Sequence, residues 1–156
     1  MAENVSYTRY DPCDSSMTEK LVQTRLDTLR EVFCLGKENA FTYKFQQDVS
    51  NYFVKGDHFT TLALSDGEII SCATCCKIEC MPTVSHPTSI RGHIMGVYTK
   101  PQYRRQGIAK KLLLMIIDEA KKQGITELSL DATADGVKLY ESVGFHNNNE
   151  SMIMSL

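Results

Sequence analysis

The chain has 156 residues, 42% of them hydrophobic, which is enough for one domain with a buried core. Its 17 basic and 19 acidic side chains give a formal net charge of -2, which excludes a general attraction to nucleic acid or anionic membranes. The first residues lack the basic-then-apolar layout of a signal peptide, and no apolar run approaches the ~18 residues of a membrane span. We therefore expect a single domain over residues 1–156, in the cytoplasm, without a nucleic-acid or membrane partner.

The N-terminal part is predicted to form one strand and two helices. Polar and apolar side chains alternate over Val5–Tyr10, which favours a short strand. Leucines recur at helical spacing over Met17–Phe33, after Ser15 or Ser16 as a cap. A second helix is predicted over Ala40–Phe53, where large apolar residues recur every fourth position.

The middle of the chain is predicted to be extended. The run "FTTLALSDGEIISCATCCKIEC" indicates two antiparallel strands joined at Asp66-Gly67, a strong hairpin signal. After a loop interrupted by two prolines, "IRGHIMGVYT" predicts another strand. Gly96 lies inside it, and a glycine there either marks a bulge or a close ligand approach, or is simply tolerated.

The C-terminal part is predicted to alternate between helices and strands. The best-supported helix covers Gln106–Gln123 and ends at Gly124. "ITELSLD" predicts a strand, and a short helix is expected over Asp135–Val143. The tail predicts a closing hairpin around Asn147–Asn149.

Four of the six cysteines lie in "SCATCCKIEC", inside an apolar run with strand character. A zinc site usually shows separated ligand pairs, which this cluster lacks. In a strand, Cys72, Cys76 and Cys80 share one face and Cys75 takes the other. We therefore interpret them as reduced thiols that serve as small hydrophobic residues, and we expect no metal.

A cluster of cations surrounds the predicted start of the 106–123 helix. Arg104, Arg105, Lys110 and Lys111 lie there, and no acidic residue follows until Asp118. Cations at a helix N-terminus oppose the helix dipole, at ~0.3–1 kcal/mol each. A ligand with more than one negative charge would turn this conflict into a binding site, because the first helical amides lack internal partners. The alternative is a solvated basic helix face without a ligand.

Two motifs identify the anion through a family resemblance. The stretch lacks both the Walker loop and the G-x-G-x-x-G fingerprint. It does fit [RQ]-x-x-G-x-[GA], as "RRQGIA" after the strand "HIMGVYT". This resembles motif A of the GNAT acetyltransferases, and "DGVKLYESVGF" over Asp135–Phe145 resembles motif B at the expected distance.

The resemblance implies a mixed, mostly antiparallel sheet of six to seven strands flanked by about four helices. It also implies acetyl-CoA as co-substrate, with the loop amides on its pyrophosphate and its pantetheine arm along the preceding strand. By this resemblance Tyr140 would donate a proton to the leaving CoA thiolate. The residues expected to bind the cofactor are Val97, Tyr98, Thr99, Arg104, Arg105, Gln106, Gly107, Ile108, Ala109 and Lys110.

The sequence leaves the identity of the general base and some of the cofactor contacts undetermined. The general base is His93, Glu79, Asp131 or an ordered water. Gly136 replaces a common alanine of motif B, and Asp131-Ala132-Thr133 stands where an asparagine that contacts the cofactor often lies.

The predicted function is transfer of an acetyl group to a primary amine of a small molecule or peptide. An acyl-CoA-binding sensor without catalysis is the alternative, and a nucleic-acid patch formed by "RRQGIAKK" is a third reading, disfavoured by the net charge. The acceptor is expected between the two N-terminal helices and the sheet, where acidic residues would attract a cationic amine: Glu31, Glu38, Asp48 and Glu79. A homodimer is a further expectation from the resemblance.

Overall fold

The computed structural model describes residues 4–38 and 41–156, and its sheet has the strand order β1-β2-β3-β4-β5. The first four strands form an antiparallel meander, and β5 joins β4 in parallel. The bounds are Ser6–Arg9 for β1, His58–Ser65 for β2, Glu68–Glu79 for β3, Ile90–Thr99 for β4 and Leu128–Leu130 for β5.

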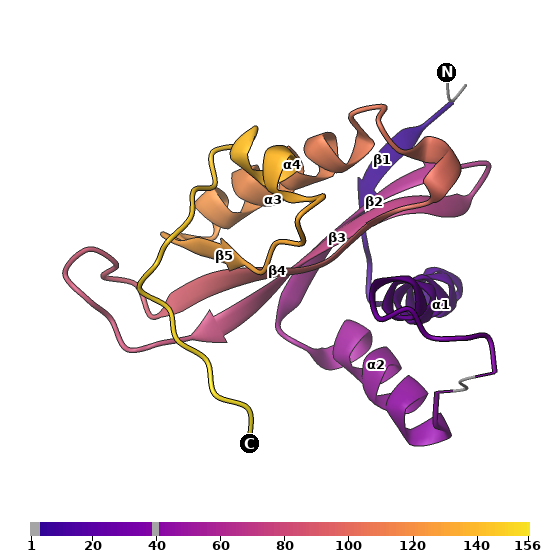
Figure 1. Cartoon of the computed structure of the whole chain (residues 1–156), viewed down its shortest axis with the longest axis horizontal. Helices are drawn as coiled ribbons and strands as arrows, with labels where there is room; N and C mark the ends of the chain where they lie inside the picture. Colours follow the sequence, from indigo (N-terminus) through magenta and orange to yellow (C-terminus); the bar gives the residue numbers. More distant parts are fainter. Residues whose placement is uncertain (1–3, 39–40) are drawn as a thin grey trace.

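Helices cover both faces of the sheet (Figure 1). Helices α1 (Ser15–Val32) and α2 (Tyr43–Lys55) lie on one face, and α3 (Ile108–Lys122) and α4 (Val137–Glu141) lie on the other. The short 3-10 helix η1 (Pro101–Tyr103) precedes α3. Within the described part of the chain, no helix is both long and apolar enough to cross a bilayer.

The cap of α1 differs from the prediction. Asp14, rather than Ser15 or Ser16, is the N-cap, because it is the last extended residue and its carboxylate accepts a hydrogen bond from the amide of Met17 at 2.9 Å. The predicted start of the second helix at Ala40 lies outside the described residues.

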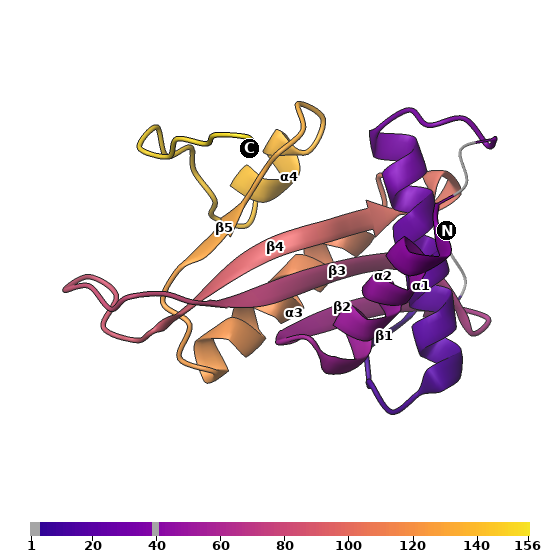
Figure 2. The same ribbon diagram turned by 90° about the horizontal axis from the view of Figure 1, so that it is seen from below.

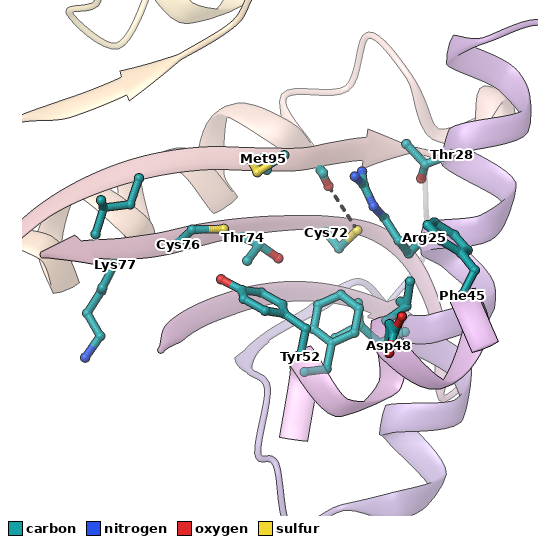
Figure 3. Close-up of a pocket in the computed structure, with 15 residues that line it drawn as sticks. Arg25, Thr28, Phe45, Asp48, Tyr52, Cys72, Thr74, Cys76, Lys77 and Met95 are labelled. Atoms are coloured by element: carbon teal, nitrogen blue, oxygen red, sulfur yellow. Dashed lines mark hydrogen bonds between the residues drawn. The ribbon is translucent and has the colours of Figure 1, made fainter. Parts of the chain in front are cut away.

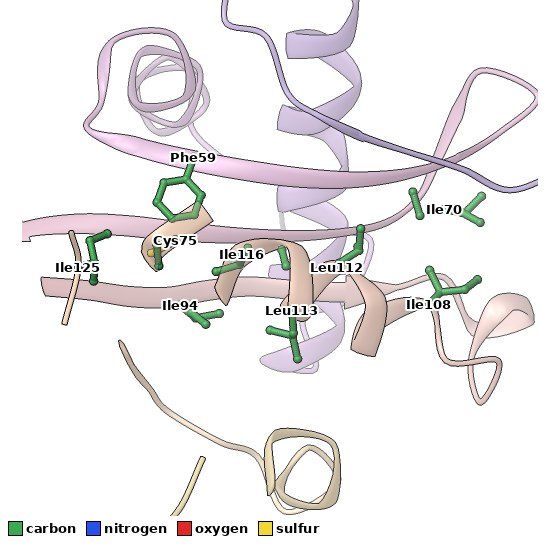
Figure 4. Close-up of a cluster of buried hydrophobic side chains, with 12 residues drawn as sticks. Phe59, Ile70, Cys75, Ile94, Ile108, Leu112, Leu113, Ile116 and Ile125 are labelled. Carbon is green, nitrogen blue, oxygen red and sulfur yellow. The ribbon is translucent and has the colours of Figure 1, made fainter. Parts of the chain in front are cut away.

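The main core lies between α3 and the sheet (Figure 4). Leu112, Leu113 and Ile116 are fully buried there, and each contributes ~1.5–3 kcal/mol through its transfer out of water. They pack on the strand side chains Cys75 and Ile94. The helical spacing that predicted α3 is therefore the spacing of its buried face.

The hairpin between β2 and β3 forms as predicted. Asp66 and Gly67 have φ of 52° and 75°, the left-handed conformations that a two-residue turn of this kind requires. The cysteines of β3 also alternate as predicted: Cys75 joins the core under α3, whereas Cys72 and Cys76 face α1 and α2.

The mixed, mostly antiparallel fold with helices on both faces is confirmed, but the number of strands is lower than predicted. The described residues form five strands instead of six to seven. The closing hairpin at Asn147–Asn149 is wrong, because Asn147 and Asn148 are irregular, a turn covers only Asn149 and Glu150, and an irregular tail follows to Leu156. Met152, Ile153 and Met154 are each at least 80% exposed, so the tail's apolar side chains have no sheet face to cover and no strand is stabilised.

The burial of the cysteines predicts their reactivity. Burial raises the pKa of both Cys72 and Cys75 to about 12, against the ordinary value of ~8.5, so neither forms thiolate near neutral pH. Cys13 and Cys34 are exposed. We expect Ellman's reagent at pH 8 to modify Cys13 and Cys34 in the native protein and to reach Cys72 and Cys75 only after unfolding. Peptide mapping by mass spectrometry checks this, and equally fast labelling of the four thiols would contradict it.

Candidate active site

Of the alternative readings of Gly96, the structure shows a bulge in β4. Cys72 of β3 pairs with Tyr98 of β4. Two residues further along β3, Thr74 pairs with Met95, which lies three residues back along β4. The extra residue is accommodated by Gly96, whose φ of 62° favours glycine.

The edge of β4 that faces β5 has no strand partner beyond Ile94, next to the bulge. β5 pairs with β4 only at Gly92, His93 and Ile94, so the edge from Met95 to Thr99 has no β5 residue beside it. Figure 2 shows β5 leading away from β4 toward α4. A free strand edge offers backbone donors and acceptors to an extended ligand.

The loop after β4 presents backbone amides to solvent. Arg105 and Gly107 have φ of 61° and 78°, and Gly107 is the N-cap of α3. No side chain caps this helix and its first turn contains no acidic residue. The amides of Ile108, Ala109 and Lys110 therefore lack intrahelical partners, which is the arrangement that binds anions.

The four cations around this loop have different surroundings. Arg104 turns toward α1: its Nε donates to the carbonyl of Thr99 at 2.8 Å, and its Nη2 pairs with Glu31. The Nζ of Lys111 lies 3.9 Å from the ring centre of Tyr7. Within residues 4–38 and 41–156, Arg105 and Lys110 form no ion pair, so these two side chains are available to an anion at the loop.

Gln106, the remaining polar residue of the loop, is exposed and donates from Nε2 to the carbonyl of Gln102 at 3.2 Å. This bond ties the loop back onto η1, while its backbone stays at the surface. The Gln106 side chain therefore holds the loop against η1 through a contact at the protein surface.

Tyr140 of α4 lies on the α3 side of the sheet. It belongs to the same hydrophobic cluster as Val97 and Ile108, and its ring meets that of Phe145 edge-on at 6.1 Å. Burial raises the pKa of Tyr140 above 10, so its hydroxyl is protonated at neutral pH.

Gly136 gives the ring of Tyr140 its space. A Cβ built at Gly136 would lie 2.9 Å from Cε2 of Tyr140, closer than real contacts allow. Alanine at this position would therefore require the ring of Tyr140 to shift from its present place.

Of the three side chains proposed as the general base, His93 and Asp131 lie close together. His93 pairs with Cys76 across β3 and β4, which fixes it on the face of α1 and α2. Its Nδ1 shares a hydrogen bond with Ser129 at 2.8 Å, and its Nε2 lies 3.7 Å from Asp131. Glu79 lies apart from them. Side chains alternate between the two faces along β3, so Glu79 is on the opposite face from Cys76.

A cavity of about 570 Å³ opens between α1, α2 and the sheet (Figure 3). Its floor is formed by Cys72, Thr74, Cys76, Lys77 and Ile78 of β3 and by Met95 and Gly96 of β4, so the cavity reaches the bulge. Its walls are formed by Leu21, Arg25, Thr28, Phe45, Asp48, Val49, Tyr52 and Phe53.

Sequence reasoning missed Arg25 and Tyr52 as lining residues. For Arg25 a signal existed, because Leu21, Arg25 and Thr28 follow one another at helical spacing and therefore share a face. Tyr52 carried no comparable signal, since it is adjacent to the buried Phe53 on the predicted core stripe.

The acidic residues expected to attract the acceptor do not form a cluster. Only Asp48 lines the cavity, and it pairs with Lys44 at 2.7 Å. Glu31 pairs with Arg104, while Glu38 and Glu79 are exposed and lie outside the lining. Among residues 4–38 and 41–156, no group of three or more metal-binding side chains is found.

Comparison with solved structures identifies the fold class. A chain described as a "predicted acetyltransferase with acetyl-CoA" from Clostridium acetobutylicum superposes with a TM-score of 0.80 at 24% identity, over 97% of this chain and 96% of that one. The fold is therefore that of the acetyltransferases. The sequence profile of the Acetyltransferase (GNAT) family matches residues 26–145, and the chain belongs to this family, as its two motifs predicted.

Curated relatives agree with this assignment. N-alpha-acetyltransferase 30 of Schizosaccharomyces pombe is 30% identical over 105 residues, which are 65% of this chain and 67% of that protein. The [Ribosomal protein bS18]-alanine N-acetyltransferase of Escherichia coli K12 is 38% identical over 56 residues, or 34% of this chain and 38% of that protein.

Proposed function

We propose that the protein transfers an acetyl group from acetyl-CoA to a primary amine. One observation carries the proposal: the free edge of β4 and the cavity between α1 and α2 meet at the same residue, Gly96. A thioester lying along the free edge and an amine in the cavity would thus approach each other at the bulge. Bringing two reactants together in this way is itself a large part of catalysis.

The cofactor would be held at two places. The amides of residues 105–110 would bind the pyrophosphate, with Arg105 and Lys110 adding an attraction that solvent screens. The pantetheine arm would pair with Val97, Tyr98 and Thr99 along the free edge. Arg104 would act on the loop's position rather than on the phosphate, since its guanidinium is engaged by Thr99 and Glu31.

The reaction would proceed by direct attack. The lone pair of the neutral amine forms the N–C bond to the thioester carbonyl carbon, and the C–S bond breaks. An amide at the bulge, such as that of Val97, would donate to the developing oxyanion. Tyr140 gives its proton to the CoA thiolate, and the proton lost by the amine passes to His93 or through water to solvent. His93 is ~10 Å along β4 from Gly96, so a direct transfer would require a bridging water.

Replacement of Gly107 tests the phosphate loop. At φ of 78°, alanine would cost about 1–2 kcal/mol of stability, and its Cβ would stand where the phosphate approaches. Gly67 in the β2–β3 turn is a matched control, with φ of 75° and equally open surroundings. We expect Gly107→Ala and Gly67→Ala to lower stability alike, whereas only Gly107→Ala weakens acetyl-CoA binding, by roughly tenfold. Calorimetric titration measures this, and equal affinities for the two variants would refute the loop's role.

Replacement of Tyr140 tests the chemistry. Tyr140→Phe keeps the ring and removes the proton, so kcat for acetyl transfer should fall ~100-fold while acetyl-CoA affinity is retained. Because burial raises the pKa of Tyr140, the wild-type rate should rise as the amine loses its proton and should not decline below about pH 10. Release of free CoA thiol gives both rates.

The same assay separates the enzyme from a silent sensor. An unchanged kcat in Tyr140→Phe would remove the tyrosine from the mechanism. Tight binding of acetyl-CoA without turnover of any amine in a broad panel would instead favour an acyl-CoA-binding sensor.

A further inference from the structure

The cavity beside the bulge contains a cation, Arg25, that forms no ion pair with any described residue. Arg25 projects from α1 across the cavity toward β4 (Figure 3). Its Nη1 lies 3.7 Å from the position that a Cβ would take on Gly96. The guanidinium is therefore next to the point where the free edge of β4 and the cavity meet.

The surroundings of Arg25 are unfavourable for an isolated charge. The residue is half-buried, and burial lowers the pKa of its guanidinium. Within the described residues it forms no ion pair and donates no hydrogen bond to a side chain or carbonyl group. Leaving a cation partly desolvated and unpaired costs free energy, which an anionic ligand would recover.

The other charges of the cavity are already balanced. Asp48 pairs with Lys44 at 2.7 Å, and Lys77 pairs with Asp57 at 2.6 Å. Among the described residues that line the cavity, the charge without an ion pair is that of Arg25. An acceptor with a second cationic group would be repelled there, whereas an anionic acceptor would be attracted.

We propose, on the basis of the proposed function, that the acceptor is a free amino acid with an apolar side chain, whose carboxylate pairs with Arg25. A planar guanidinium matches a carboxylate through two parallel hydrogen bonds. Because Arg25 is beside the bulge, the anion must be attached close to the reacting nitrogen, and the α-carboxylate of an amino acid is one carbon away from it. The rest of the cavity is formed largely by Phe45, Val49, Tyr52 and Met95, which suit an apolar side chain.

The proposed pairing with Arg25 distinguishes a free amino acid from the N-terminal amine of a peptide as the acceptor. A peptide has an amide in place of the α-carboxylate, so it would leave Arg25 unpaired. The α-amino group of an amino-acid amide also loses its proton more readily than that of the free amino acid, so a preference for the acid would not come from the reactivity of the amine.

The test is a comparison of kcat/KM for three matched acceptors, L-leucine, L-leucinamide and isoamylamine, and for the corresponding phenylalanine series. We expect the wild type to prefer the amino acid over its amide by ~10- to 100-fold, as for a charge pair formed out of water. Arg25→Met should remove this preference and Arg25→Lys should retain part of it, with acetyl-CoA affinity unchanged in both. Arg30→Met removes the same charge from the same helix outside the cavity, where Arg30 pairs with Asp27, and should behave as the wild type.

Two outcomes would overturn the inference and they are distinguishable. If the amide or isoamylamine is acetylated as well as leucine, or if Arg25→Met leaves the preference intact, the acceptor assignment is wrong while the acetyltransferase activity stands. If neither series nor any other amine is acetylated although acetyl-CoA binds, the proposed function itself fails and the acceptor assignment fails with it.

Discussion

The bulge at Gly96 is the feature on which the rest of the site depends. It adds one residue to β4 without breaking its pairing with β3 on either side. At the same level β5 stops following β4, which leaves one strand edge free in an otherwise continuous sheet. Since β4 belongs to the core through Ile94, the packed face under α3 holds this irregular point in place.

The two faces of the sheet supply different parts of the site. The face under α3 is densely packed, and it supports the amide-rich loop and Tyr140. The face under α1 and α2 has a smaller core, built around Leu21 and Phe53, and the space left beside it is the cavity. In the proposed reaction, dense packing would fix the geometry for the donor, whereas the looser face would leave room for the acceptor.

The positive charges at the start of α3 have separate roles. Arg104 joins the loop before α3 to α1 through Glu31, and α1 also forms a wall of the cavity. Lys111 covers the ring of Tyr7 on β1. The unfavourable effect on the helix dipole, ~0.3–1 kcal/mol per cation, is therefore partly offset by contacts inside the protein. Of the four cations, Arg105 and Lys110 form no ion pair with a described residue and would remain available to a ligand.

Local signals in the sequence predicted much of this fold. The Asp66-Gly67 turn and the buried stripe of α3 each reflect a constraint within a few residues, and both were confirmed, whereas for Gly96 the sequence left a bulge as one of two readings. The tail was mispredicted because a turn signal near Asn148 does not supply the partner strand that a hairpin needs. Arg25 was overlooked for a similar reason: an arginine on an amphipathic helix resembles solvated surface until α2 and β4 enclose it.

The claim that the free edge of β4 and the loop before α3 together bind acetyl-CoA is tested most directly by amide chemical shifts in the wild-type protein. Titration with acetyl-CoA should shift the backbone amides of residues 95–99 and 105–110 together, with one shared dissociation constant. Shifts confined to other parts of the chain, or no shifts at millimolar acetyl-CoA, would contradict the account.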